Sequence, residues 1–200
     1  MTKQKARGIL GMDERPMILS FGGSLGARRI NETVADVMAW HWKSGQIVHY
    51  HATGEYGVEL MPKLLAEKGV DLNCENIHIT EYIDNMDVML AAADLVICRS
   101  GAITISELAV QGKPSVLIPS PNVAENHQYH NAMTLVSRGA AAIVEEKDLT
   151  GEKLTQTVSE LITDKARLEK MSQNARKCAI TDTNERIYRI IMKLYESTKK

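Results

Sequence analysis

The stretch that decides the fold is Asp94-Leu-Val-Ile-Cys-Arg-Ser-Gly-Ala-Ile-Thr-Ile-Ser-Glu107. Residues 94–98 form an apolar run typical of a buried parallel strand. A turn of small residues follows, and then apolar residues at helical spacing predict a helix with Ser100 as its N-cap. We expect three apolar side chains to pack this helix on the core: Ile103, Leu108 and Val110. A buried strand, a turn and a helix N-terminus predict an anion site, because free backbone N–H groups and the positive end of the helix dipole meet there.

Glu107 extends this interpretation from phosphate to nucleotide. It lies further along the same predicted helix, where its carboxylate can reach back to sugar hydroxyls. The layout therefore suggests a phosphate at the Ser100 turn and a ribose at Glu107. A capped helix with a solvated glutamate fits the same residues, so this stretch alone leaves both interpretations open.

Composition excludes several classes of function. A chain of 200 residues suits one domain. Its net charge of −1 indicates no polybasic surface for nucleic acid or for a membrane, and its 4% aromatic content argues against a base-stacking platform. The three cysteines are far apart in the sequence, which is typical of reduced thiols, and no apolar run is long enough to cross a bilayer. We therefore expect a cytoplasmic protein.

Working outward, apolar runs alternate with helical patterns along the chain. Residues 1–15 are polar and weakly patterned, so we expect a linker remnant there and a single domain over residues 16–200. We predict six strands, at residues 16–21, 46–52, 76–80, 94–98, 113–119 and 140–144. Helices are predicted between them, including 84–93 with Asp84 as the cap, and the remainder of the chain is predicted to be helical. This alternation predicts an α/β fold, a Rossmann-like parallel sheet covered by helices on both faces.

The first predicted strand runs into a glycine turn, Gly22-Gly-Ser-Leu-Gly-Ala27. Gly22, Gly23 and Gly26 let the backbone approach a ligand closely, so we predict a phosphate loop here. The spacing does not match the G-x-G-x-x-G dinucleotide fingerprint, and no Lys-Ser/Thr pair follows as in a P-loop.

Four polar features converge at the carboxyl edge of the predicted sheet. They are the glycine turn, Ile83 after the third strand, the Ser100 turn and the loop before Gln128. Ligands of open α/β sheets bind at this edge. No histidine pair has a further ligand at metal-binding spacing and no Asp-x-Asp occurs, so we expect no metal and no cofactor. A bound diphosphate would be stabilised by amides and helix dipoles.

Five ordered motifs resemble the C-terminal domain of the MurG-type transferases, with a match over residues 5–198. They are Gly22-Gly-Ser-Leu-Gly-Ala-Arg28, Cys98-Arg-Ser-Gly-Ala102, Ser106-Glu107, Gly112-Lys-Pro114 and Asn126-His-Gln-Tyr-His-Asn-Ala132. These bacterial peptidoglycan enzymes move N-acetylglucosamine from its UDP carrier to undecaprenyl-pyrophosphoryl-N-acetylmuramoyl-pentapeptide, converting lipid I to lipid II. The resemblance implies one half of a GT-B glycosyltransferase, the half that binds UDP-N-acetylglucosamine.

The resemblance also implies a role for each site residue. Ser24 would lie against the diphosphate, Ile83 would offer backbone groups to uracil, and Glu107 would accept hydrogen bonds from the ribose. Amides at Ser100, Gly101 and Ala102 would face the diphosphate and sugar. N-acetylglucosamine would be held by Gln128 and Asn131 with His127 beside them. The family often has Gln where Leu25 stands, so any amide contact from that position is lost or replaced.

In this family an N-terminal half carries the lipid-linked acceptor site, the general base and the surface that associates with the cytoplasmic face of the membrane. These 200 residues do not include it, so we expect the isolated domain to be inactive. Two alternatives stay open: a naturally separate donor-binding subunit of a two-subunit N-acetylglucosaminyltransferase, and a non-catalytic nucleotide-binding module. The terminal apolar stripe of Ile187, Ile191 and Leu194 either is a contact surface, for self-association or for the other half, or packs on its own domain.

Overall fold

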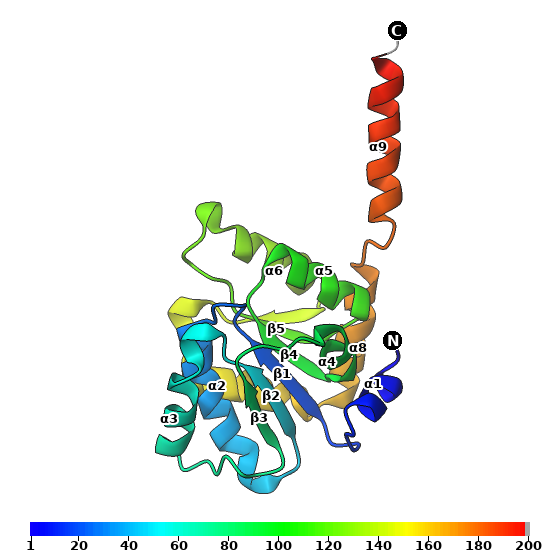
Figure 1. The fold of residues 1–200 in the computed structure, drawn as a ribbon. Helices are drawn as coiled ribbons and strands as arrows, with labels where there is room; N and C mark the ends of the chain where they lie inside the picture. Colours follow the sequence, from blue (N-terminus) through cyan, green and yellow to red (C-terminus); the bar gives the residue numbers. More distant parts are fainter. Residues whose placement is uncertain (199–200) are drawn as a thin grey trace.

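A six-stranded, entirely parallel sheet lies between two layers of helices (Figure 1) in the computed structural model, which describes residues 1–198. The strands are β1 (Met17–Phe21), β2 (Val48–Ala52), β3 (Ile77–Thr80), β4 (Leu95–Cys98), β5 (Ser115–Leu117) and β6 (Ala141–Ile143). Their order across the sheet is β3-β2-β1-β4-β5-β6. Strands β2 and β3 are therefore added on one side of β1, and strands β4 to β6 on the other side. The predicted parallel α/β fold is confirmed.

Each face of the sheet is covered by its own group of helices. One face carries α2 (Arg28–His41), α3 (Leu60–Glu67) and α7 (Gly151–Ile162), and the other carries α1 (Lys3–Ile9), α4 (Met86–Ala92), α5 (Ala102–Gln111) and α6 (His127–Val136). The helix α8 (Lys165–Lys177) contributes Met171 to the first core and Ala175 to the second. Neighbouring residues of β1 show why the strands read as continuous apolar runs: Ile18 packs in one core and Leu19 in the other.

The predicted packing face of α5 is partly wrong. Leu108 is fully buried, but Ile103 is 77% exposed and Val110 is 48% exposed. Ile105 and Ala109 pack beside Leu108 instead, since residues three and four apart share a helix face. Ile103 and Val110 are seven apart, and the same periodicity places both on the solvent side.

Two predicted helix caps are also wrong. The N-cap of α5 is Gly101, not Ser100, and the N-cap of α4 is Asn85, not Asp84. The Ser100 hydroxyl donates instead to the Gln128 carbonyl at 2.8 Å, so a long-range contact takes the group that the local pattern assigned to a cap.

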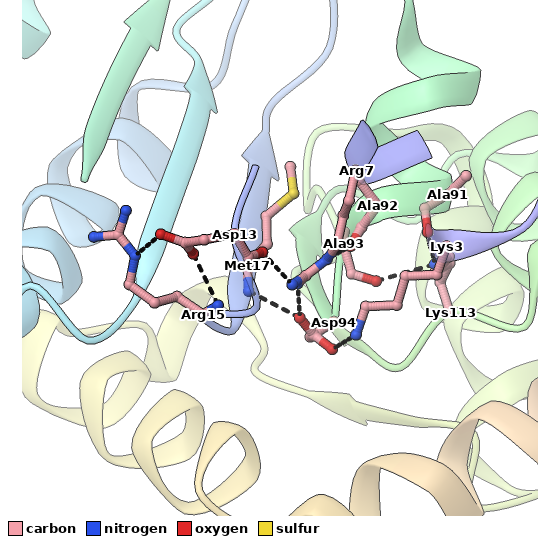
Figure 2. A network of polar contacts seen from close by, with 10 residues as sticks. All are labelled: Lys3, Arg7, Asp13, Arg15, Met17, Ala91, Ala92, Ala93, Asp94 and Lys113. Carbon is pink, nitrogen blue, oxygen red and sulfur yellow. Dashed lines mark hydrogen bonds and ion pairs between the residues drawn. The ribbon is translucent and has the colours of Figure 1, made fainter. Parts of the chain in front are cut away.

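Residues 1–15 hold more structure than the expected linker remnant. Helix α1 lies within them, and its Ala6 and Arg7 side chains are buried. Figure 2 shows the Arg7 guanidinium donating to the Asp13 carbonyl at 2.9 Å and to the Asp94 carboxylate at 2.7 Å. Asp94 also accepts the β1 amide of Met17 at 2.9 Å, so α1 is tied to the amino edge of the sheet.

The C-terminal end of α4 is closed by two buried cations in the same network (Figure 2). Arg7 donates to the Ala92 carbonyl at 3.3 Å, and the Lys113 ammonium donates to Ala91 and Ala93 at 2.7 and 3.0 Å. Burial lowers the pKa of Lys113 to about 8. Cations at a helix C-terminus donate to its last carbonyls and interact favourably with the negative end of its dipole. A structural role therefore explains why Arg7 and Lys113 are buried here.

The last helix, α9 (Thr183–Ser197), projects away from the domain (Figure 1) and has no buried residue. Four apolar side chains of this helix are more than half exposed: Ile187, Ile190, Ile191 and Leu194. The alternative in which the stripe packs on its own domain is therefore wrong. Residues 199–200 of the predicted domain lie outside the described residues. Across residues 1–198, no helix combines the length and the apolar character that a bilayer span requires.

Candidate functional site

The glycine turn and the Ser100 turn leave neighbouring strands at the same edge of the sheet. Phe21 and Cys98 are register partners at the carboxyl ends of β1 and β4, and each is followed directly by its turn. On one side, β2 and β3 follow β1, with Thr80 three residues before Ile83. On the other side, β5 follows β4 and leads to α6. The topology thus brings the four predicted features to one edge.

The glycine turn has a shape that side chains would prevent. A Cβ atom at Gly22 would lie 2.5 Å from the Ala27 nitrogen, and one at Gly26 would lie 2.3 Å from the Thr53 carbonyl oxygen. Gly23 and Gly26 also have φ angles of +101° and +84°. Ser24 and Leu25 are exposed between them, so the turn presents backbone, one hydroxyl and one apolar side chain to solvent.

The N-terminus of α5 is open. Its N-cap, Gly101, makes no side-chain cap hydrogen bond, so side chains leave the first-turn N–H groups of this ten-residue helix uncapped. Ser100 is fully buried beneath it, where its carbonyl accepts the Asn131 side-chain amide at 3.1 Å. An anion at this turn would meet backbone N–H donors and the positive end of the α5 dipole.

Helix α6 is bonded to the Ser100 turn, which brings three predicted site residues together. Besides the contacts of Ser100 to Gln128 and Asn131, the Gln128 side-chain oxygen accepts the Ser120 amide at 3.0 Å. Within residues 1–198 the Gln128 NH₂ group and the Asn131 side-chain oxygen have no partner, so each amide keeps one end available. His127 is exposed at the first position of α6.

Glu107 and Ile83 stand at either side of these turns. Burial raises the pKa of the Cys98 thiol at the end of β4, and the Glu107 carboxylate raises it further. Glu107 itself is exposed on α5. The Ile83 side chain is buried, and its backbone N–H has no hydrogen-bond partner within the described residues.

Sequence reasoning missed the contacts that brace this edge. Arg99 pairs with Glu146 at 2.5 Å and donates to the Ile118 and Pro119 carbonyls at 3.2 and 3.1 Å, which ties the β4 turn to the end of β5. Glu125 and Asn126, just before α6, both have a φ of 51°, an uncommon conformation for residues other than glycine. No local pattern marks either feature, although backbone outliers gather at functional sites.

The chemistry of the edge suits an anionic ligand with hydroxyl groups. It offers open amides at two turns, an exposed carboxylate, and amide side chains on α6. Residues 1–198 hold no cluster of three His, Cys, Asp or Glu side chains suited to a metal ion. Backbone amides and helix dipoles at this edge can stabilise a diphosphate.

Comparison with known proteins identifies a family and relatives. Residues 17–187 match the glycosyltransferase family 28 C-terminal domain. The chain is 42% identical over 192 residues to the UDP-N-acetylglucosamine--N-acetylmuramyl-(pentapeptide) pyrophosphoryl-undecaprenol N-acetylglucosamine transferase of Acetivibrio thermocellus, covering 96% of this chain and 51% of that protein. It is 43% identical over 195 residues to the protein of the same name from Ruminiclostridium cellulolyticum, covering 96% and 52%. The chain thus spans about half the length of the curated relatives it matches.

The structure agrees with this assignment. It superposes on the crystal structure of Acinetobacter baumannii MurG with a TM-score of 0.78 at 31% identity, covering 90% of this chain and 53% of that one. The glycosyltransferase WaaG, at 19% identity and a TM-score of 0.65, shares the fold alone. The predicted architecture, one half of a GT-B glycosyltransferase, is confirmed by these likenesses. This chain belongs to the family of glycosyltransferase family 28 C-terminal domains.

Proposed function

We propose that this chain is the donor-binding domain of a peptidoglycan glycosyltransferase that moves N-acetylglucosamine from UDP-N-acetylglucosamine to undecaprenyl-pyrophosphoryl-N-acetylmuramoyl-pentapeptide. One observation carries the proposal: the uncapped N-terminus of α5 and the glycine turn lie after neighbouring strands at the carboxyl edge. A diphosphate fits such a place, because both elements offer unpaired backbone donors. The name shared by relatives 42–43% identical supplies the substrates.

Each part of the donor has a place along this edge. The diphosphate lies between Ser24 and the Gly101 and Ala102 amides, and uracil lies at the Ile83 backbone. The ribose hydroxyls donate to Glu107. The free ends of the Gln128 and Asn131 amides, with His127 beside them, bind the N-acetylglucosamine hydroxyls.

The domain contributes to the reaction by holding the leaving group. The acceptor hydroxyl attacks the anomeric carbon in a single displacement, UDP departs, and the configuration at that carbon inverts. Negative charge grows on the diphosphate as the bond breaks, and the dipole and amides at the N-terminus of α5 stabilise it without reorganising. No metal ion is needed for this role in this half.

The remaining groups belong to an N-terminal half outside these residues. That half supplies the lipid-linked acceptor site, the general base and the contact with the cytoplasmic face of the membrane. The isolated domain therefore binds donor and does not turn it over. Measurable transfer to a lipid acceptor by the isolated chain would contradict this division.

Calorimetric titration with UDP, UDP-N-acetylglucosamine and NAD, each without metal, tests the proposal. We expect both UDP compounds to bind, NAD not to bind, and Glu107→Ala to weaken UDP binding. Glu160→Ala is the matched control, since Glu160 is an exposed glutamate of α7 on the opposite face of the sheet. Binding of NAD without UDP favours the nucleotide-module alternative, and equal binding by both variants removes the ribose role from Glu107.

We further propose that the exposed stripe of α9 lets the isolated chain self-associate. Helix α9 is amphipathic and 15 residues long, and its stripe is exposed to solvent, so pairing would remove a row of isoleucine and leucine side chains from water. Sedimentation of the whole chain should show a dimer that disappears when residues 182–200 are removed. A whole chain that sediments as a monomer at high concentration contradicts the proposal.

A further inference from the structure

A line of hydrogen-bonded polar side chains runs through the core beneath α2. Its members are all at least 98% buried, and in order along the line they are His41, His49, Ser20, His51 and Asn31. The first three links measure 3.2 Å between His41 and His49, 2.8 Å from His49 to Ser20 and 2.8 Å from Ser20 to His51. His51 meets the Asn31 side-chain oxygen at 3.1 Å. The line ends at the Thr53 carbonyl, which the Asn31 NH₂ group reaches at 3.0 Å.

The end at Thr53 sets the direction of every bond in the line. A carbonyl only accepts, so Asn31 turns its NH₂ group to Thr53 and its oxygen to His51. His51 must then carry its hydrogen on Nε2, which leaves Nδ1 to accept from the Ser20 hydroxyl. This bond of 2.8 Å is preferred over the contact of Ser20 to the Tyr50 carbonyl at 3.4 Å.

The directions of the remaining hydrogen bonds, from Ser20 to His41, follow in the same way. The Ser20 oxygen, having donated its one hydrogen, accepts from His49 Nε2, and His49 Nδ1 accepts from His41 Nε2. His41 Nδ1 is then a bare, buried acceptor, in agreement with its lack of any partner. All three histidines are neutral Nε2–H tautomers, and burial lowers the pKa of each.

Residues 53–57, which begin at the Thr53 carbonyl where the line ends, are hydrogen-bonded to the glycine turn. The Glu55 amide donates to the Ser24 carbonyl and the Tyr56 amide donates to the Leu25 carbonyl, both at 3.2 Å. The Thr53 oxygen is also the atom that a Cβ at Gly26 would meet at 2.3 Å. Displacement of Thr53 therefore moves the turn assigned to the diphosphate.

The segment is bonded on its other side to the loop that leads to Ile83. Thr53 donates its amide to the Thr80 carbonyl at 2.9 Å, and Gly54 donates to Glu81 at 3.0 Å. A Cβ at Gly57 would lie 2.2 Å from the Asn31 amide nitrogen, so Asn31 is wedged against the segment at both ends. One buried asparagine thus braces the segment shared by the places proposed for diphosphate and uracil.

We propose that Asn31 is a positioning residue of the donor site. It holds residues 53–57, and through them the glycine turn and the approach to Ile83, in the geometry that receives a nucleoside diphosphate. The buried line through His51 and Ser20 orients the Asn31 amide by making its oxygen an acceptor. The ligand named in this inference rests on the proposed function. The bracing of residues 53–57 by Asn31 does not depend on that function.

The test compares Asn31→Leu with a matched control, Asn76→Leu. Asn76 is also a buried asparagine whose NH₂ group donates to backbone carbonyls, those of Trp42 and Ile47 at 3.2 Å, but it directly precedes β3. Both variants replace a buried, hydrogen-bonding amide with an apolar and slightly larger side chain. A purely structural role predicts the same outcome for both.

Two readouts separate the inference from the proposed function. For Asn31→Leu we expect amide hydrogen exchange at Glu55 and Tyr56 to become at least about ten-fold faster and UDP binding to weaken at least about ten-fold. For Asn76→Leu we expect both to stay within about two-fold of wild type. Wild-type chain that fails to bind UDP overturns the proposed function, whereas unchanged exchange and unchanged UDP affinity in Asn31→Leu overturn the positioning role.

A third readout needs no variant and decides the matter if Asn31→Leu does not fold. Nitrogen NMR of the wild-type chain should show His41, His49 and His51 as Nε2–H tautomers, and UDP should shift the Asn31 side-chain NH₂ resonance while leaving that of Asn76 in place. A different tautomer in His51, or an Asn31 resonance that UDP at saturation leaves unmoved, contradicts the inference.

Discussion

Mild acid should destabilise this domain through its three buried histidines. Burial lowers the pKa of His41 and of His51 to about 4, and it lowers that of His49 well below its ordinary value. In the unfolded chain all three return to about 6.5. Between these values the unfolded chain binds more protons than the folded one, so the free energy of unfolding falls as the pH falls through 6.5 toward 4.

The size of the loss at pH 5 follows from the unfolded chain. At pH 5 the folded histidines are still mostly neutral. The loss in the free energy of unfolding therefore depends on how far pH 5 lies below the unfolded-state pKa of about 6.5, and it amounts to about 2 kcal/mol for each histidine. Three histidines remove about 6 kcal/mol relative to neutral pH, against a total stability of about 5–15 kcal/mol for a typical domain. The hydrogen bond from Arg28 lowers the pKa of Glu32 from its ordinary value of 4.5, so the stability that Glu32 contributes is lost mainly below pH 4.5 and changes little between pH 7 and pH 5.

Urea unfolding at pH 7 and pH 5, at equal ionic strength, measures this loss. His41→Phe keeps a ring against His49 and removes one titrating group, so its loss should shrink to about 4 kcal/mol. His127→Phe, at an exposed position on α6, should lose as much as wild type. A wild-type difference below about 1 kcal/mol between the two pH values would refute the assignment of three neutral buried histidines.

Two further predictions concern packing and the glycine turn. Leu108→Ala should lower the free energy of unfolding by about 2–5 kcal/mol because it empties a fully buried site, whereas Ile103→Ala, on the exposed side of α5, should change it by less than about 0.5 kcal/mol; urea midpoints compare them. Gly26→Ala should lower thermal stability and abolish UDP binding, since the new Cβ meets the Thr53 carbonyl and the φ is positive, while Gly11→Ala, also at positive φ but in open space, should leave UDP binding unchanged.

The sequence alone predicts the sheet well because its strands are buried on both faces. A continuous apolar run, such as the one with Ile18 and Leu19 in β1, can be recognised without knowing which strands pair with it. The glycine turn after β1 can be recognised because its backbone shape leaves no room for side chains at Gly22 and Gly26. The carboxyl edge follows from the alternation of strands and helices, without any knowledge of contacts.

What the sequence could not predict depends on contacts between distant residues. Ser100 reads as a cap, yet its hydroxyl bonds to Gln128 on another helix. Residues 1–15 are polar and weakly patterned, which is typical of a linker. Their order in the structure comes from the partly buried ion pair between Arg7 and Asp94, which are 87 positions apart. The alternating histidines of β2 read as ordinary strand residues until Ser20 and Asn31 are seen to join them to the Thr53 carbonyl.

A backbone amide NMR titration of the whole chain with UDP-N-acetylglucosamine locates the donor site directly. We expect the largest shifts at the carboxyl edge of the sheet, over residues 22–26, at Ile83 and over residues 100–102. We expect no comparable shift at the amino edge around Arg7 and Lys113, whose charges close the end of α4. Shifts centred on that opposite edge, or none at saturating ligand, would contradict the donor site described here.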